Sequence, residues 1–562
     1  MNPTPVFFIV VGVISVIVGW FVQPALNAAF VGSWVALAAV LLLAGAASIG
    51  AEVARKGRLE WRWLTSSLSG RLTAIGAVMV PLALAVWFIT SAPVFHAARY
   101  AALIGDMRPV PGNAAEVALP NLSIDRAPLV TRSVAQRAAE NRLGGEDPAL
   151  GSVVEIGRMT RQTLNGRLVW VGPLEHRGLF AWLRNRTTPG YVVVDASNPE
   201  KVEVVRSVGE KPLQLRYLES AFLQEQLHRH AYLGGAVFEA LGTTTFQLDD
   251  AGKPFAVLPL LSHAIGMSAP VVSAVLVVDV QSGVAERYTR DAAPAWIDRI
   301  EPPELVFHRL EDWGRYHSGG WFNPSQAGRL QTSTWELDLV SADDGHNYWV
   351  TGLTSVGRDT SLTGLVLVDT RTGKPRRYAL SGIVEEQASA IVEQAYREKG
   401  YKASNPTPLL VEGTPAYVMS LTDDAGSTKA YGMVAVGNKE AFATAPTLEA
   451  TLRMFQSRQT IGRRAGPAEE GTERQQLAGR IARIGSAVRE GNSWFYFTLE
   501  EQPQQLLVAT GELNEELALT KTGDTVKVEF LLVESGSAEV RSFENVTLGR
   551  KAGTRLSEHA VE

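Results

Sequence analysis

Two histidines, His228 and His230, are the first residues whose type could do chemistry. Imidazole nitrogens bind transition metals, and a third ligand could come from His263, His308 or His317. Histidines that share a metal on one helix usually lie three or four residues apart, because that spacing places them on one face. A spacing of two favours structural or solvent-facing histidines, so the sequence predicts no metal site.

Motifs of the common enzyme classes are missing from the sequence. It contains no Gly-x-Ser-x-Gly elbow, Walker loop, Gly-x-Gly-x-x-Gly or His-Glu-x-x-His. It also contains no cysteine, which removes disulfides, thiolate catalysis and cysteine-ligated metals. We therefore predict a protein that is not an enzyme and that uses no cofactor.

The best candidate for a ligand or partner surface is an aromatic segment between two predicted strand units. Its members are Trp296, Trp313, Tyr316, Trp321 and Phe322. Tryptophan and tyrosine combine a large apolar area with a polar tip, which suits an interaction surface. The alternative is that a helix and a loop pack here across a module boundary. Near the C-terminus, Trp494 and Tyr496 form a second candidate surface.

The N-terminal part of the chain has the composition of a membrane anchor. The first 51 residues contain no Asp, Glu, Lys or Arg. An ionised side chain at the middle of a bilayer costs roughly 2.5–3.5 kcal/mol on insertion scales. The apolar runs Val6–Val22, Trp34–Gly50 and Leu72–Ala92 predict three transmembrane helices. A cleaved signal peptide is the alternative for the first run, but the preceding residues lack its positive charge.

The loop charges predict the orientation of these helices. Residues 51–71 form a loop that carries five basic residues, whereas the loop between the first two runs carries no charge. The positive-inside rule places the basic loop in the cytoplasm and everything after Ala92 outside. That outer region has 48 basic and 56 acidic residues and no disulfides. We predict a multi-pass cell-membrane protein with a large extracytoplasmic C-terminal region, of a bacterial envelope type.

The outer region repeats one strand pattern four times. The copies begin at Tyr191, Ala274, Gly364 and Tyr431, and each is a β-branched run that ends in Asp or Gly at a turn. Such runs predict hairpins in which Asp195, Asp279 and Asp369 are turn residues and not ligands. The spacing of apolar residues predicts helices over Val130–Leu143 and Ile383–Tyr401, before the first and last copies.

A helix followed by three or four antiparallel strands, with Val-Asp-x-x-x-Gly late in the unit, resembles the PepSY domain family. The pattern covers roughly residues 130–445 in up to four degenerate copies. The resemblance implies small extracytoplasmic α+β domains that hold peptidases inactive or have other envelope binding roles. The alternative is a plain sheet-and-helix scaffold. The predicted boundaries are a connector over 93–128 and modules over 129–210, 211–300, 301–380 and 381–457.

The C-terminal region changes to longer alternating strands. Residues 458–474 are polar and glycine-rich and predict a linker, residues 475–552 contain five predicted strands, and residues 553–562 form a tail. Five strands in this span resemble an OB-fold barrel, with Ile481, Ile484, Phe497, Val526 and Val528 in its core. Some OB barrels bind single-stranded nucleic acid. Residues 475–550 carry 7 basic and 11 acidic residues, which favours a protein or glycan partner instead.

These observations predict a membrane-anchored α+β protein with three N-terminal transmembrane helices, repeated helix-plus-antiparallel-sheet modules and a five-stranded β-barrel. The leading hypothesis is a non-enzymatic cell-envelope protein that binds partner proteins as a scaffold or assembly component. The alternatives are a regulator or inhibitor of a surface peptidase or hydrolase, and a nucleic-acid-binding membrane protein acting through the barrel. The expected partners are the lipid bilayer and other envelope proteins, and the sequence leaves a homo-oligomer open.

Overall fold

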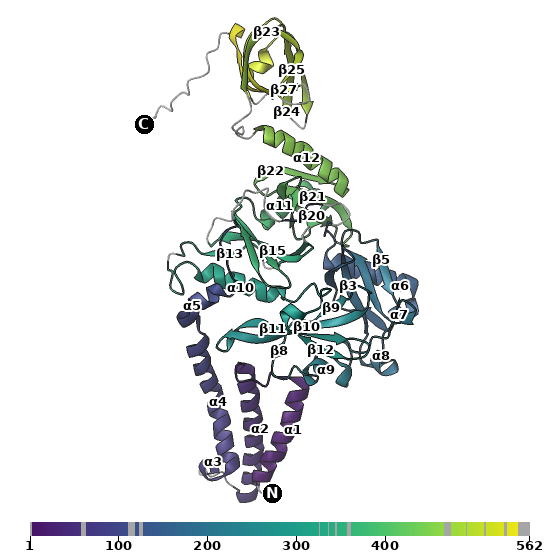
Figure 1. Cartoon of the computed structure of the whole chain (residues 1–562), viewed down its shortest axis with the longest axis vertical. Coiled ribbons are helices and arrows are strands. Elements are labelled where there is room, and N and C mark those ends of the chain that lie inside the picture. Colours follow the sequence, from purple (N-terminus) through teal and green to yellow (C-terminus); the bar gives the residue numbers. More distant parts are fainter. Residues whose placement is uncertain are drawn as a thin grey trace. The chain divides into compact units, whose positions relative to one another are not determined.

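The computed structural model forms two compact units, residues 1–455 and 456–562 (Figure 1). It describes residues 3–57, 63–110, 119–122, 127–324, 326–334, 337–342, 345–356, 361–465, 474–489, 492–510, 513–532 and 537–548. Part of the predicted basic loop, residues 466–473 of the predicted linker and the tail 553–562 lie outside these ranges.

Three helices at the N-terminus are long and apolar enough to cross a membrane, as the sequence predicted. They are α1 (Pro3–Phe21), α2 (Val31–Lys56) and α4 (Leu68–Ser91). The second helix is longer than its apolar run, because good helix formers continue it to Arg55 and Lys56, and Gly57 ends it at a φ of 70°. Two shorter helices, α3 (Trp63–Ser66) and α5 (Pro93–Ala102), flank α4.

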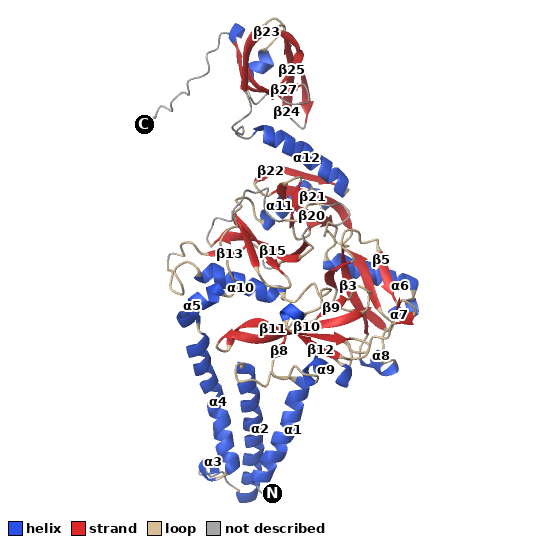
Figure 2. Cartoon of the chain, in the orientation of Figure 1, coloured by secondary structure: helices blue, strands red, loops and turns tan. Residues whose placement is uncertain are grey.

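The rest of the first unit is mostly β-structure, in four five-stranded antiparallel sheets that share one strand order (Figure 2). The first has β1 (Val154–Ile156), β2 (Thr160–Leu164), β3 (Arg167–His176), β4 (Tyr191–Asp195) and β5 (Val202–Val205). The second has β8 (Ala240–Leu241), β9 (Thr245–Leu248), β10 (Pro254–Ile265), β11 (Ser268–Asp279) and β12 (Ala285–Tyr288). The third has β13 (Leu330–Thr332), β14 (Asp338–Ser341), β15 (Asn347–Ser355), β16 (Leu362–Asp369) and β17 (Pro375–Tyr378). The fourth has β18 (Lys402–Ala403), β19 (Thr407–Val411), β20 (Thr414–Thr422), β21 (Thr428–Ala435) and β22 (Asn438–Ala445).

In each sheet, the third strand pairs with both earlier strands and with the fourth strand, which pairs with the fifth. A small two-stranded sheet of β6 (Ser207–Val208) and β7 (Lys211–Pro212) separates the first two sheets in sequence. The sheets share cores in pairs: Val171 and Leu258 belong to one core of the first two sheets, and Tyr348 and Tyr417 belong to one core of the last two.

The predicted turn role of the aspartates is confirmed. Asp279 Oδ1 accepts from the backbone N–H of Gln281 at 2.9 Å, and Asp369 Oδ1 accepts from that of Thr372 at 2.7 Å. Gly283, four residues after Asp279, has a φ of 77°, which glycine adopts without steric cost. The hairpins therefore follow from local turn chemistry.

Helices precede the strands of several sheets. They are α6 (Arg132–Glu146) with α7 (Pro148–Gly151), α9 (Leu227–Leu233), α10 (Pro303–Tyr316) and α11 (Glu385–Ala395), while α8 (Leu179–Arg184) lies between β3 and β4. The first and last match the two predicted helices, although α11 is shorter than predicted. Helix α10 corresponds to the helix that the sequence analysis gave as the alternative to an aromatic surface.

The second unit contains five strands whose pairings run in a ring. They are β23 (Arg474–Arg489), β24 (Asn492–Leu499), β25 (Gln502–Thr510), β26 (Thr525–Leu532) and β27 (Ser537–Asn545), joined in the order β23-β24-β25-β27-β26. Four of the predicted core residues, Ile481, Phe497, Val526 and Val528, are buried, and Ile484 is half-buried.

The predicted linker is wrong over its first residues. Helix α12 spans Leu448–Ala465 and so covers 458–465. Strong helix formers such as Leu452, Arg453 and Gln456 carry the helix forward, and the single Gly462 costs only about 1 kcal/mol in a helix.

Candidate anion-binding site

A cavity of the first unit has a volume of about 900 Å³ and is lined by residues of all four sheet regions. This volume lies within the roughly 300–1,000 Å³ that is usual for small-molecule sites. The start of α6, the start of β2, the segment before β9, the segment leading into α10, β14 and the loop before β19 all reach it. Because residues of all four sheet modules line the cavity, one ligand could contact every module.

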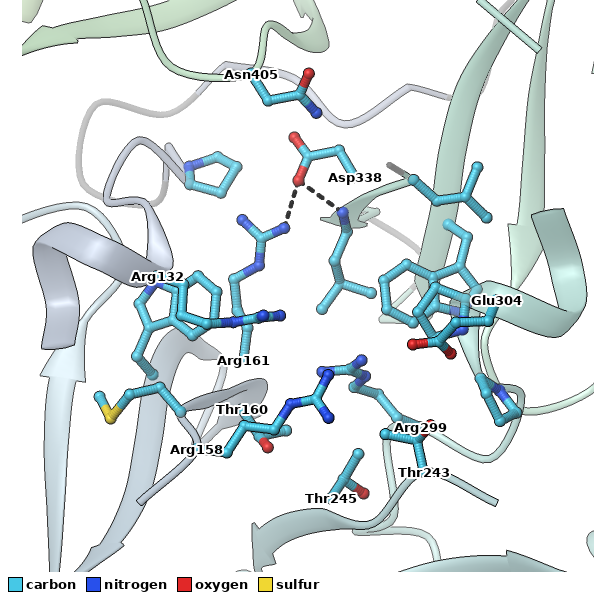
Figure 3. Close-up of a pocket in the computed structure, with 18 of the residues that line it drawn as sticks. Arg132, Arg158, Thr160, Arg161, Thr243, Thr245, Arg299, Glu304, Asp338 and Asn405 are labelled. Carbon is cyan, nitrogen blue, oxygen red and sulfur yellow. Dashed lines mark hydrogen bonds and ion pairs between the residues drawn. The ribbon is translucent and has the colours of Figure 1, made fainter. Parts of the chain in front are cut away.

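Four arginines line this cavity: Arg132, Arg158, Arg161 and Arg299. Figure 3 shows their side chains entering the same space from different elements. Hydroxyl and amide groups surround them, from Thr131, Thr160, Thr243, Thr245, Ser404 and Asn405. Guanidinium groups donate to carboxylate and phosphate oxygens in a fixed fork, and hydroxyls can add further donors.

The carboxylates that line the cavity balance only part of this charge. Asp338 is paired with Arg161 and accepts from the Thr407 hydroxyl. Glu301 is completely buried, and its charge is met by Arg290 and by Arg309, whose Nη1 lies 3.2 Å from Glu301 Oε2. Both of these partners lie outside the cavity lining. Glu304 is the remaining carboxylate in the lining.

Two of the arginines hold buried donors without partners. The Nε atoms of Arg161 and Arg299 are buried and have no hydrogen-bond partner among the residues that the structure describes. The guanidinium of Arg299 forms no ion pair there either. It lies 4.7 Å from the ring centre of Trp349, while that of Arg161 lies 5.2 Å from the ring centre of Trp170. Stacking holds both cations in place, and Arg161 is in addition paired with Asp338.

Burial is the main cause that lowers the pKa of Arg299 to about 9, and the positive charges of the nearby Arg161 and Arg132 contribute to the same shift. Arg299 stays protonated at neutral pH, because 9 is still well above 7. Like charges are thus held together in a partly desolvated space, at a free-energy cost that a bound anion would relieve. The arrangement can bind a ligand with more than one negative charge.

The two indole rings are themselves fixed. Trp170 Nε1 donates to the carbonyl of Val130 at 2.8 Å, and Trp349 Nε1 donates to the carbonyl of Glu301 at 2.9 Å. Both acceptors belong to segments that line the cavity. Each tryptophan therefore ties a strand to the segment before a helix, and it positions one stacked arginine.

The predicted aromatic surface is divided by the fold. Trp313 and Tyr316 are buried on α10, so they cannot belong to an exposed surface, and Trp313 stacks on His317 with ring centres 4.2 Å apart. Trp296 is half-buried and stacks on Phe255. Trp321 and Phe322 are exposed.

In the second unit, Trp494 and Tyr496 are both half-buried in β24. They lie two residues apart on one strand, so their side chains are on the same face of it. Neither residue lines the arginine cavity, and this candidate surface stays a prediction.

The two histidines of α9 have separate partners. His228 Nε2 lies 3.0 Å from the Thr244 hydroxyl, and His230 Nε2 lies 2.7 Å from the carbonyl of Gly283. Among the described residues, no group of three or more His, Asp or Glu side chains is placed to hold a metal ion.

The sequence analysis missed the four arginines because no local motif joins them. Arg132 is the first residue of α6, Arg158 precedes β2, Arg161 lies in β2, and Arg299 lies in a loop. Locally, the sequence offers only that Arg299 lies five residues before Glu304, in a segment with two prolines that leads into α10.

No family model and no curated protein matches this chain. Solved structures of a Bombyx mori GH32 beta-fructofuranosidase, BmSUC1, give weak matches. One is 12% identical with a TM-score of 0.18 and covers 72% of this chain and 69% of that chain. A mutant of the same enzyme in complex with sucrose is 11% identical, with the same TM-score and coverage. Such low TM-scores carry no argument about fold or activity.

Proposed function

We propose that this chain is a membrane-anchored, extracytoplasmic binding protein whose cavity between the sheets takes a multiply charged anionic ligand. The observation that carries the proposal is the group of four arginines, two of which have a buried Nε without a partner among the described residues. Buried donors in native proteins are nearly always satisfied, so a partner is expected at this site.

The proposal keeps the non-enzymatic scaffold role as its broader frame. Four sheets with one strand order support an interpretation as PepSY-like modules, and the ring of five strands supports an OB-like barrel. The positive-inside rule supports an extracytoplasmic position for both. Under this proposal the modules position a shared ligand site, and partner proteins bind elsewhere.

A thermal-shift series on the full chain in detergent tests the proposal. The probes are sulfate, phosphate, pyrophosphate and tripolyphosphate at one constant ionic strength. We expect the melting temperature to rise along the series, because more oxygens can reach more guanidinium groups. The gain should disappear in a chain that carries both Arg158→Gln and Arg299→Met.

The matched control is Arg167→Gln, which changes an exposed arginine at the β2–β3 turn of the same sheet. This variant should keep the whole gain. An equal gain in all three chains would mean that the anions act on the general surface, and the proposal would fail.

A further inference from the structure

A band of exposed apolar side chains lies beside the C-terminal end of α1. Its members are Leu179, Phe180, Leu183, Leu223, Leu233 and Phe238. Phe180 is 84% exposed and Phe238 is 64% exposed. Single exposed apolar residues are normal, whereas a contiguous group of this kind marks an interaction surface.

Hydrogen bonds fix part of this band to the end of α1 and to the residues that follow it. The Tyr232 hydroxyl donates to the carbonyl of Pro24 at 2.8 Å. Arg229 Nε donates to the carbonyl of Trp20 at 3.1 Å, and its guanidinium lies 4.5 Å from the Trp20 ring centre. Helix α9, which carries Leu233, therefore lies at the level where α1 ends (Figure 1).

Helix α8 is joined to the same region. Trp182 points inward, where its Nε1 donates to Glu225 at 2.9 Å and its ring lies 5.5 Å from that of Phe222. Because Trp182 faces the core, Phe180 and Leu183 face outward on the other side of the helix. Leu223 follows directly after Phe222, so α8 lies next to the segment that carries Leu223.

Basic residues flank α8 on both sides. Arg177 precedes it and Arg184 is its last residue, and both are exposed. A short helix with aromatic and aliphatic residues on one face and arginines at its ends is typical of segments that lie in a membrane interface. The arginines would meet anionic lipid headgroups, and the apolar residues would reach the acyl boundary.

We infer that this band, residues 177–184 with Leu223, Leu233 and Phe238, lies in the interfacial layer of the same bilayer that α1, α2 and α4 cross. The lipid-facing surface of α1 continues into it, since Phe21 and Val22 are exposed at the point where α1 ends. The soluble part is thereby held against the membrane surface in one orientation. The inference rests on the membrane anchor and is independent of the ligand site.

The experiment uses the full chain, which contains no cysteine, with single cysteines introduced for nitroxide labels. The variants are Phe180→Cys, Phe238→Cys and, as the control, Lys439→Cys, an exposed position on β22 of the fourth sheet. Each labelled chain is placed in phosphatidylcholine vesicles that contain phosphatidylglycerol. Power-saturation EPR then measures collisions with oxygen, which concentrates in lipid, and with a water-soluble nickel chelate.

We expect the labels at 180 and 238 to collide more with oxygen than with the nickel chelate, and the label at 439 to do the reverse. Arg177→Gln combined with Arg184→Gln should move the label at 180 toward the water-exposed values. The inference is overturned if the labels at 180 and 238 behave like the label at 439. It is also overturned if they are shielded from both reagents and show spin–spin broadening that vanishes on dilution with unlabelled chain, because a second copy would then cover the band.

Discussion

Arginine has different surroundings in two regions of the molecule, the turn between β16 and β17 and the arginine cavity. The guanidinium of Arg371, in the turn, donates to the carbonyls of Ala293, Pro294 and Ala295 at 2.9–3.1 Å and also to that of Ile297. Arg299, a few residues further along the same segment, stacks on Trp349 and has a buried Nε with no partner in the described part of the chain.

This contrast separates a structural arginine from a binding one. Arg371 is a cross-link, since its guanidinium donates to four backbone carbonyls of the 293–297 segment. Arg299 is held in position by an aromatic ring, and in our proposal its guanidinium donates to the bound anion. We therefore expect replacement of Arg371 to lower the stability of the chain. We expect replacement of Arg299 to raise the stability of the ligand-free chain and to weaken ligand binding.

The largest expected effect is on stability at Arg371. Arg371→Met should lower the free energy of unfolding by about 2–3 kcal/mol, because several carbonyls of the 293–297 segment lose their donor together. Chemical denaturation in detergent measures this change. Arg167→Met, at an exposed turn, is the control and should be nearly silent. An unchanged denaturation midpoint for Arg371→Met would show that the hydrogen bonds of Arg371 do not stabilise the fold.

The second effect has the opposite sign. Arg299→Met keeps the side-chain length over Trp349 and removes a charge whose pKa burial has lowered to about 9. We expect the ligand-free chain to gain up to about 1 kcal/mol of stability, as occurs when a residue kept for binding is replaced. The same variant should lose the tripolyphosphate-dependent rise in melting temperature. A stability loss as large as that of Arg371→Met would mean that both arginines are structural.

A third effect, confined to neutral and higher pH, concerns Glu175, a half-buried acid on β3. Burial raises the pKa of Glu175 to about 7 from its ordinary 4.5, with Glu219 adding repulsion. Between these pH values the folded chain keeps the proton while the unfolded chain loses it. The contribution of Glu175 to stability is thus fully present below about pH 4.5 and is lost as the pH rises through 7.

Glu175→Gln should therefore resemble the parent chain at low pH and exceed it by about 1–2 kcal/mol at pH 8. Melting curves across this pH range measure the difference. The control is Glu203→Gln, an exposed carboxylate on β5 of the same sheet. A constant difference at every pH would show that Glu175 titrates normally.

Local rules explain why the helices and hairpins could be predicted. A long uncharged apolar run predicts a membrane-spanning helix, and the three N-terminal helices follow from such runs. An aspartate four residues before a glycine predicts a tight turn, as found at Asp279 and Asp369. The prediction that the aromatic segment forms one interaction surface failed, and the sequence itself contains the reason. Val306, Leu310 and Trp313 follow helical spacing and are all buried, so the pattern indicated an amphipathic helix whose core face includes the tryptophan.

The cavity could not be predicted by such rules. Arg132 and Arg299 come together only because sheets far apart in sequence pack around one space. No single module carries the charge pattern, and the region after Ala92 is acidic overall. Residues that form a site between repeats do not recur at a fixed spacing in the sequence, so no periodic pattern indicates them.

The central claim is that the four arginines bind an anion, and isothermal titration of tripolyphosphate into the full chain at fixed ionic strength tests it most directly. We predict saturable binding that weakens at least about tenfold in Arg299→Met, or about 1.4 kcal/mol, and that is unchanged in Arg167→Gln. Equal affinity in all three chains, or no saturable heat in the parent chain, would contradict the claim.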